Sequence, residues 1–266
     1  MNGLGGFTRA AQWLRRAARI VRIVAVVAYG LGLGVGFAIS DRLGVPGAAA
    51  RRQRWTRAFM RRLSAALPFK VLVQGDIPQR PMLWVSNHVS WTDIAVLGQL
   101  APLSFLSKAE VRGWPIAGWL AQQAGTLFIR RGANDSQRLR RDMALRLADG
   151  HGLVIFPEGT TTDGRSLRTF HGRLLACAAD AGVAVQPVAL RYVRNGEADA
   201  IAPFIGDDDL LCHLLRLLRG DISEVQVHLL APIETSGIER AALAYQAQEA
   251  VRRALFGAVT GVAQAA

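Results

Sequence analysis

Residues 82–93 read MLWVSNHVSWTD, and this stretch decides how the fold is predicted. The apolar run at its start is typical of a buried strand, and a histidine and an aspartate follow it five positions apart. On a regular helix, positions i and i+5 lie roughly 140° apart and pair poorly. His88 and Asp93 can therefore meet only if His88 lies on the turn that leaves the strand and Asp93 lies on the first turn of the next helix.

A histidine paired with a carboxylate is a frequent arrangement for acid–base catalysis. Imidazole is the usual general base near neutral pH, and a carboxylate on its other ring nitrogen selects the tautomer and stabilises the imidazolium. His-x4-Asp is nevertheless a weak pattern by itself, since a helix-capping or core histidine more often explains it. The neighbouring motifs decide between these two interpretations.

From about residue 67 onward, short apolar runs alternate with amphipathic segments. We expect strands at residues 69–74, 82–86, 103–106, 126–130, 153–156, 183–190 and 224–230. We expect helices at residues 91–100, 116–123, 136–148, 172–181, 210–218 and 238–256. The alternation predicts an α/β fold with a mixed, largely parallel sheet flanked by helices.

Three polar clusters follow predicted strands. Asn87 and His88 come after the strand at residues 82–86, Arg130 and Arg131 lie at the end of the strand at 126–130, and the sequence FPEGT at residues 156–160 lies at the end of the strand at 153–156. Because ligands in open α/β sheets bind beyond the carboxyl ends of the strands, we expect all three clusters to face one crevice. The arginine pair is suited to an anion such as phosphate, and the glutamate can accept a substrate hydroxyl.

The first 66 residues alternate between basic and apolar blocks. An uncharged run of 18 residues, 23–40, lies between two arginine-rich blocks at residues 9–22 and 51–62. As a helix this run would span about 27 Å, slightly less than the roughly 30 Å of a hydrocarbon core, and the second basic block predicts an amphipathic helix at the membrane interface. We therefore divide the chain into membrane-associating N-terminal helices, residues 1–66, and a catalytic domain, residues 67–266.

The topology of the N-terminal segment is open to two interpretations. Basic residues flank the apolar run on both sides, so the positive-inside rule does not favour translocating either flank. We expect a helix pair that enters one leaflet and returns, with the catalytic domain on the cytoplasmic side of the inner membrane; a single membrane-spanning helix is the alternative. Glycines at positions 30, 32, 34 and 36 form two overlapping Gly-x-x-x-Gly pairs, which favour close helix approach but also permit an irregular segment.

Charge and cysteine usage restrict the function classes. A hydrophobic content of 51% excludes a disordered chain, and a net charge of +12 favours an anionic partner. Membrane lipids fit this requirement, whereas nucleic acid fits poorly because the arginines form no recognition-helix pattern. Cys177 and Cys212 stand apart, so we expect neither a disulfide framework nor a metal site. A metal-dependent hydrolase that uses His88 and Asp93 as ligands is a rival, which the lack of a third ligand at suitable spacing disfavours.

Four motifs in order make the sequence resemble the glycerolipid acyltransferases, and among them the bacterial 1-acylglycerol-3-phosphate acyltransferase type. They are Asn87-His88-x4-Asp93, Phe128-Ile129-Arg130-Arg131, Phe156-Pro157-Glu158-Gly159-Thr160 and Val185-Gln186-Pro187-Val188. The segment around Lys108 between the first two motifs also matches, so the resemblance covers roughly residues 83–192.

The resemblance implies that an acyl chain passes from a thioester to a hydroxyl of a lysolipid, with no covalent acyl-enzyme and no cofactor. It implies that His88 takes the proton of the acceptor hydroxyl and that Asp93 orients His88. It implies substrate-binding roles for Asn87, Lys108, Arg130, Arg131, Glu158, Gly159, Thr160 and Pro187. Acyl-CoA or acyl-ACP is then the co-substrate, and the basic chain suits an acidic acyl carrier protein.

One position departs from the family pattern. Members that act on lysophosphatidate usually carry arginine after Glu-Gly-Thr, and this chain has Thr161 there. The resemblance favours 1-acylglycerol-3-phosphate as the acceptor and phosphatidic acid as the product, a step of phospholipid biosynthesis. The missing guanidinium makes an O-acyltransferase for lyso-ornithine lipid or another lysolipid the alternative, and a non-catalytic lipid-binding relative is more distant.

Overall fold

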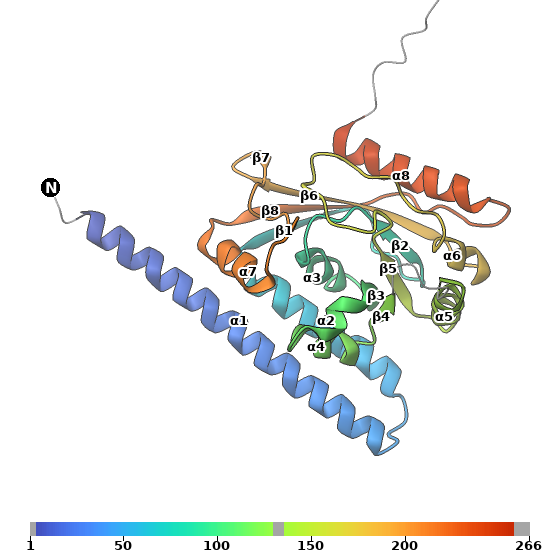
Figure 1. The fold of residues 1–266 in the computed structure, drawn as a ribbon, viewed down its shortest axis with the longest axis horizontal. Helices are drawn as coiled ribbons and strands as arrows, with labels where there is room; N and C mark the ends of the chain where they lie inside the picture. The colour runs from blue at the N-terminus through green and yellow to red at the C-terminus, as the bar shows by residue number, and fades with distance from the viewer. Residues whose placement is uncertain (1–3, 130–135, 258–266) are drawn as a thin grey trace, which may run out of the picture.

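A mixed, mostly parallel sheet with helices on both faces forms the centre of the protein (Figure 1). The computed structural model describes residues 4–129 and 136–257. The strand order is β1-β8-β6-β2-β5-β3-β4, and β7 pairs with β6. The strands are β1 (Phe69–Gln74), β2 (Leu83–Ser86), β3 (Leu103–Lys108), β4 (Leu127–Ile129), β5 (Gly152–Ile155), β6 (Val185–Arg194), β7 (Glu197–Ala198) and β8 (Ser223–Leu229). The predicted fold class is confirmed.

Strand β2 lies in the middle of the sheet because every one of its side chains is apolar or small enough to be buried. It runs parallel to both neighbours, with Val85 opposite Ile155 of β5 and Pro187 of β6. Trp84 joins the core on one face, and Leu83 and Val85 join the core on the other. A strand buried on both faces is what the continuous apolar run predicts.

Two helical layers cover the sheet. Figure 1 shows α8 on one side of the sheet, and α3, α7 and the N-terminal helix pair on the other. The helices of the catalytic region are α3 (Thr92–Gly98), α4 (Ala117–Gln123), α5 (Ser136–Ala148), α6 (Ala176–Asp180), α7 (Leu210–Arg219) and α8 (Arg240–Phe256), with a 3-10 turn at Ala109–Gly113. The α3 side shares a core with Trp84, and the α8 side shares one with Val85.

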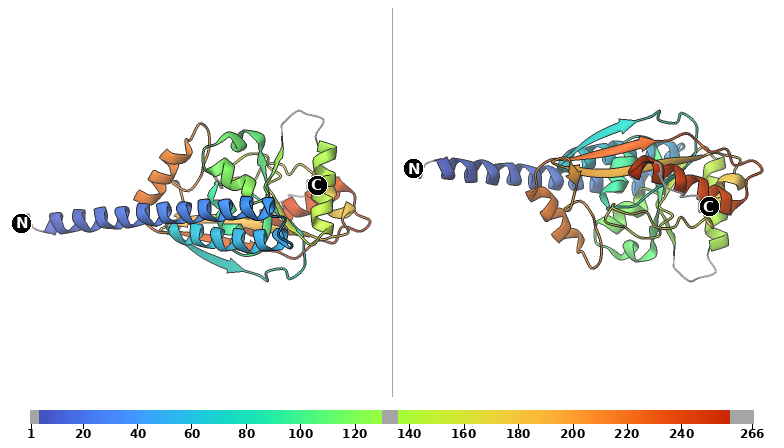
Figure 2. Two further views of the ribbon diagram at one scale, coloured as in Figure 1. Left: turned by 90° about the horizontal axis from the view of Figure 1, so that it is seen from below. Right: turned by 90° about the horizontal axis from the view of Figure 1, so that it is seen from above.

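The N-terminal segment is an antiparallel helix pair, α1 (Leu4–Arg42) and α2 (Ala48–Ala66), which lie side by side in Figure 2. The helix α1 is continuous through the four glycines, so the irregular segment is ruled out. A Cβ atom at Gly30 would overlap the Phe59 ring of α2, and one at Gly34 would overlap the Trp119 ring of α4. These two glycines therefore let α1 approach its own chain closely, without a second molecule.

Two predicted elements differ most from the structure. Strand β6 continues four residues past the predicted end at residue 190, because Asn195 and Gly196 form a tight turn with φ values of 54° and 84° that returns the chain as β7. Helix α6 is shorter than predicted, since it begins at Ala176 rather than Gly172. A Cβ atom at Gly172 would lie 2.8 Å from the carbonyl oxygen of Arg240, so this stretch packs against α8 as turns.

Candidate active site

His88 and Asp93 meet at the carboxyl end of β2, as their spacing predicts. His88 lies on the turn after β2, and Asp93 lies in the first turn of α3. The Nδ1 atom of His88 lies 2.8 Å from Oδ2 of Asp93. Because an ionised carboxylate only accepts hydrogen bonds, Nδ1 carries the proton in this pair, and Nε2 is the ring nitrogen that can act as a base.

Asp93 is fully buried, and its carboxylate receives donors from three directions. Besides the His88 ring, Oδ2 accepts the backbone N–H groups of Val89 at 2.8 Å and Ser90 at 3.0 Å. The other oxygen, Oδ1, accepts the hydroxyl of Tyr192 at 2.6 Å. These donors stabilise a negative charge that burial alone would disfavour.

Glu158 holds the backbone of the same turn from the β5 side. Its Oε1 accepts the backbone N–H of His88 at 2.8 Å, and its Oε2 accepts the backbone N–H of Arg168 at 2.9 Å. Burial raises the pKa of Glu158, and the two N–H donors oppose that shift. The ring of His88 also stacks on Phe156 with a centroid distance of 3.9 Å and an interplanar angle of 11°. The segment that follows β5 therefore fixes both the backbone and the ring plane of His88.

The other predicted substrate-binding residues occupy different environments. The Asn87 amide is turned inward, where it donates to the Leu190 carbonyl at 2.9 Å and accepts the Leu190 N–H at 2.8 Å. Pro187 is buried inside β6, opposite Val85. Lys108 is exposed at the end of β3, two strands from β2.

The FPEGT motif passes over the end of the sheet next to His88. Gly159 adopts a φ of 69° and is exposed, and Thr160 is half-buried. The chain then runs past His88, whose carbonyl accepts the backbone N–H of Thr162 at 2.8 Å. Arg130 and Arg131 lie outside the described residues, so the structure places only the start of their motif, at the end of β4.

Thr161, where the family pattern has arginine, is tied to a neighbouring loop. Its hydroxyl donates to the carbonyl of Phe204, and the Phe204 N–H donates to the Val89 carbonyl at 2.9 Å. Thr161 is thus linked through one residue to the backbone that follows His88. This arrangement places a short neutral side chain beside the histidine turn.

Tyr192, Thr92 and Phe204 contact the site, and the sequence pattern did not select them. The predicted strand ended at residue 190, two positions before Tyr192. The available sequence signal was that apolar and polar residues continue to alternate past residue 190, with Arg191 between Leu190 and Tyr192. In the structure Leu190 and Tyr192 are buried and Arg191 is exposed. No local signal pointed to Phe204, which lies in a loop before α7.

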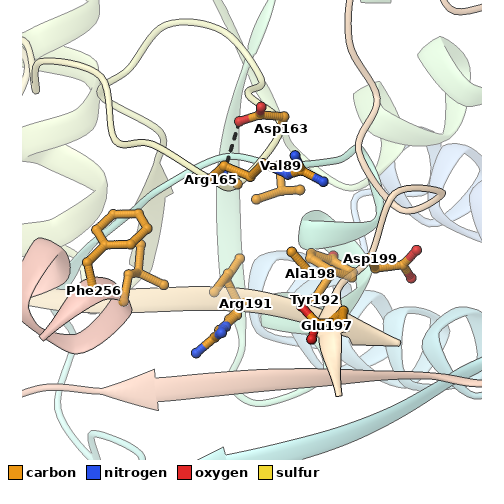
Figure 3. Close-up of a pocket in the computed structure, with 12 residues that line it drawn as sticks. Val89, Asp163, Arg165, Arg191, Tyr192, Glu197, Ala198, Asp199 and Phe256 are labelled. Carbon is orange, nitrogen blue, oxygen red and sulfur yellow. Dashed lines mark hydrogen bonds between the residues drawn. The ribbon is translucent and has the colours of Figure 1, made fainter. Parts of the chain in front are cut away.

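A cavity of about 430 Å³ lies behind the histidine turn, between the segment 163–165, the end of β6 and the end of α8. Among the lining residues, Figure 3 shows Val89 and Arg165 in the upper part of the view, Arg191 below them and Phe256 at the left. Neither His88 nor Asp93 lines this cavity. The cavity is therefore adjacent to the His88–Asp93 pair, but neither of these side chains lines it.

Comparisons with known proteins agree with this architecture. The family model described as Acyltransferase matches residues 69–191. A lyso-ornithine lipid O-acyltransferase of Pseudomonas aeruginosa is 61% identical over 244 residues, covering 92% of this chain and 95% of that protein. A 1-acyl-sn-glycerol-3-phosphate acyltransferase of Neisseria gonorrhoeae is 32% identical, covering 77% and 82%. The crystal structure of the 1-acyl-sn-glycerophosphate acyltransferase of Thermotoga maritima shares the fold, with a TM-score of 0.60, 21% identity and coverage of 89% and 96%.

The fold is that of an acyltransferase, and the chain belongs to the glycerolipid acyltransferase family. It is an acyltransferase of lysolipids. Its long apolar helix α1, with a stretch at Gln12–Arg42 long enough to cross a membrane, fits membrane association.

Proposed function

We propose that this protein transfers an acyl chain from a thioester to the hydroxyl of lyso-ornithine lipid. The observation that carries this choice is Thr161, whose short hydroxyl side chain is bound to the Phe204 carbonyl where phosphate-binding relatives have a guanidinium. The identity of 61% to a protein named for this reaction supports the same acceptor. Acylation of 1-acylglycerol-3-phosphate is the second candidate, favoured by the relatives from Neisseria.

The chemical step follows from the geometry of His88. With Nδ1 bound to Asp93, Nε2 takes the proton from the acceptor hydroxyl as its oxygen attacks the thioester carbonyl. The tetrahedral intermediate collapses with loss of the thiolate, which receives a proton. The products are an ester and a free thiol, and the histidine returns to its starting state.

Side-chain chemistry explains why the acceptor depends on position 161. A phosphate group carries up to two negative charges and is bound best by the bidentate fork of arginine. An ornithine headgroup has no phosphate and carries an ammonium group beside its carboxylate, and an arginine at this position would repel the ammonium group. The neutral Thr161, followed two residues later by Asp163, suits a headgroup with a positive charge.

The remaining motif residues have three proposed kinds of role. Glu158 and Asn87 position the histidine turn, because their polar atoms bind backbone groups around it. Lys108, Arg130 and Arg131 bind anionic parts of the substrates, which for acyl-CoA or acyl-ACP include phosphates. Gly159, Thr160 and Pro187 shape the site, as the family resemblance implies. The acceptor lipid then reaches His88 from the cytoplasmic leaflet of the inner membrane.

Product identification tests the proposal. The purified protein is incubated with one acyl donor and equal amounts of lyso-ornithine lipid or 1-acylglycerol-3-phosphate, and the acylated products are quantified by mass spectrometry. We expect preferential acylation of lyso-ornithine lipid and a loss of at least about a hundredfold in turnover for His88→Ala, since general-base catalysis contributes roughly 10²–10⁴-fold. Unchanged turnover of that variant would contradict the role of His88, and preferential acylation of the phosphate acceptor would overturn the choice of substrate.

Two variants at position 161 separate charge from structure. Thr161→Arg is expected to lower the rate with lyso-ornithine lipid and to raise the rate with 1-acylglycerol-3-phosphate. Thr161→Val removes the same bond to Phe204 without adding charge, so it serves as the matched control. If both variants change the two rates equally, the selection of the acceptor headgroup does not depend on the charge at this position.

A further inference from the structure

Tyr192 is a buried tyrosine whose hydroxyl reaches the carboxylate of the catalytic pair. It projects from β6, beside β2, and is 4% exposed. Its hydroxyl lies 2.6 Å from Oδ1 of Asp93 and 2.9 Å from Oγ1 of Thr92. Its ring packs edge-on against Phe69 at a centroid distance of 5.5 Å. The ring thus belongs to the core, whereas the hydroxyl belongs to the site.

The direction of each hydrogen bond in this chain is determined by the available protons. The ionised Asp93 carboxylate has no proton to give, so the Tyr192 hydroxyl donates to it. Since that hydroxyl has a single proton, the Thr92 hydroxyl must donate to the tyrosine oxygen. The polarity runs from Thr92 through Tyr192 to Asp93, and hydrogen bonds aligned in this way strengthen one another.

We propose that Tyr192, supported by Thr92, is a positioning residue for the His88–Asp93 pair, and that it controls how strongly His88 holds a proton. This inference rests on the proposed role of His88 as the base. His88 binds one oxygen of Asp93, and Tyr192 binds the other, so the carboxylate is held between the ring and the phenol. With both oxygens engaged, Asp93 keeps the plane that aligns the His88 ring.

The phenol also draws charge away from the carboxylate. If that donor is removed, more negative charge faces the imidazole ring, and the protonated form of His88 becomes more stable. Among the residues that the structure describes, the other ionisable groups that act on this network are Glu158, just after β5, and Asp199, after β7, and Tyr192→Phe leaves both in place. The acidic limb of the plot of kcat/KM against pH therefore reports on the hydrogen bond between Tyr192 and Asp93.

Tyr192→Phe tests the inference because it removes only the hydroxyl and keeps the ring against Phe69. We expect kcat to fall by about tenfold, the equivalent of one hydrogen bond to a charged group, with KM for the lysolipid changed less than about twofold. We also expect the acidic limb of kcat/KM against pH to move to higher pH. Thr92→Val should shift the limb in the same direction by a smaller amount, and Thr92→Ser should restore the original profile.

Tyr245→Phe is the matched control, since this tyrosine lies on α8 and is 69% exposed. It is expected to match the unmodified protein in kcat and in pH profile. If Tyr192→Phe lowers the melting temperature but leaves kcat and the pH profile unchanged, the residue is structural and the inference fails while the proposed function stands. If His88→Ala itself retains turnover, the failure lies in the proposed function.

Discussion

Three consecutive backbone N–H groups of the histidine turn point at two buried carboxylates. Glu158 accepts the N–H of His88, and Asp93 accepts those of Val89 and Ser90. Each carboxylate is buried, so these N–H donors are needed to stabilise its negative charge. The conformation of the histidine turn likewise depends on the two carboxylates. At the scale of single residues, His88 is therefore aligned through its backbone as much as through its ring.

His213 makes a buried polar contact with Trp91, between His88 and Asp93 in the sequence. The contribution of His213 to the stability of the fold depends on pH. Its Nδ1 accepts the Trp91 indole N–H at 3.0 Å, and its Nε2 donates to the carbonyls of Ile201 and Pro203 at 3.1 Å. Burial lowers the pKa of His213 below 6.5. A histidine with a lowered pKa binds fewer protons in the folded state, so its contribution to stability is complete above about pH 6.5 and falls as the pH drops toward the folded pKa.

We therefore expect the melting temperature in detergent to fall between pH 7 and pH 5, and His213→Gln to reduce that dependence. At pH 7 this variant should be less stable by about 1–3 kcal/mol, because it breaks hydrogen bonds in a buried position. His171→Gln removes an exposed imidazole and is the control. An unaltered slope in the His213 variant would show that other groups cause the pH dependence.

At the scale of elements, α1 has two glycine faces with different surroundings. Gly30 and Gly34 face aromatic rings of α2 and α4, whereas a Cβ atom at Gly32 or Gly36 would meet no atom within 4 Å. All four positions would gain helix propensity from alanine, by roughly 1 kcal/mol each. Steric overlap opposes that gain only on the packed face.

Gly36→Ala is thus expected to leave the free energy of unfolding unchanged or to raise it, by up to about 1 kcal/mol. Gly34→Ala is expected to lower it by about 1–3 kcal/mol, because the Trp119 ring must move. Denaturant unfolding in detergent, followed by tryptophan fluorescence, measures both. Equal values for the two variants would mean that α1 does not pack on α4 in solution.

At the scale of the whole molecule, the packing of α1 bears on its depth in the membrane. Arg19 donates to the carbonyls of Leu218 and Gly220 at the end of α7, and Gly34 faces Trp119 of α4. These contacts are separated by about 22 Å along α1 at ~1.5 Å per residue. A membrane-spanning α1 would draw the polar surface of the catalytic region into the bilayer, which is costly. We therefore expect α1 to lie along one leaflet.

Labelling from one side of the membrane distinguishes the two topologies. In a protein with Cys177 and Cys212 replaced, a single cysteine is placed at Gln12 or at Asp163, and proteoliposomes are treated with a membrane-impermeant maleimide. A helix pair in one leaflet predicts that both positions are labelled from the same side. Labelling of Gln12 only after the membrane is permeabilised, in vesicles where Asp163 reacts directly, would establish a spanning helix instead.

The sequence by itself determined the features that depend on neighbouring residues. The apolar run before Asn87, the five-residue spacing of His88 and Asp93, and the alternation of strands and helices predict the parallel sheet and the catalytic pair. These features are local, since strand burial and the first helical turn depend on a few consecutive residues. The four family motifs, which occur in the expected order along the chain, then predicted the reaction class.

Only the tertiary structure decided which distant groups complete the site. Tyr192 is 99 residues from Asp93, and Glu158 is 70 residues from His88, so their contacts arise from the pairing of β6 and β5 with β2. The same pairing turns the Asn87 amide inward to Leu190, at a residue for which the family resemblance implied a substrate-binding role. Strand order depends on the burial of whole faces against α3 and α8, and that balance is a property of the assembled sheet rather than of any one segment.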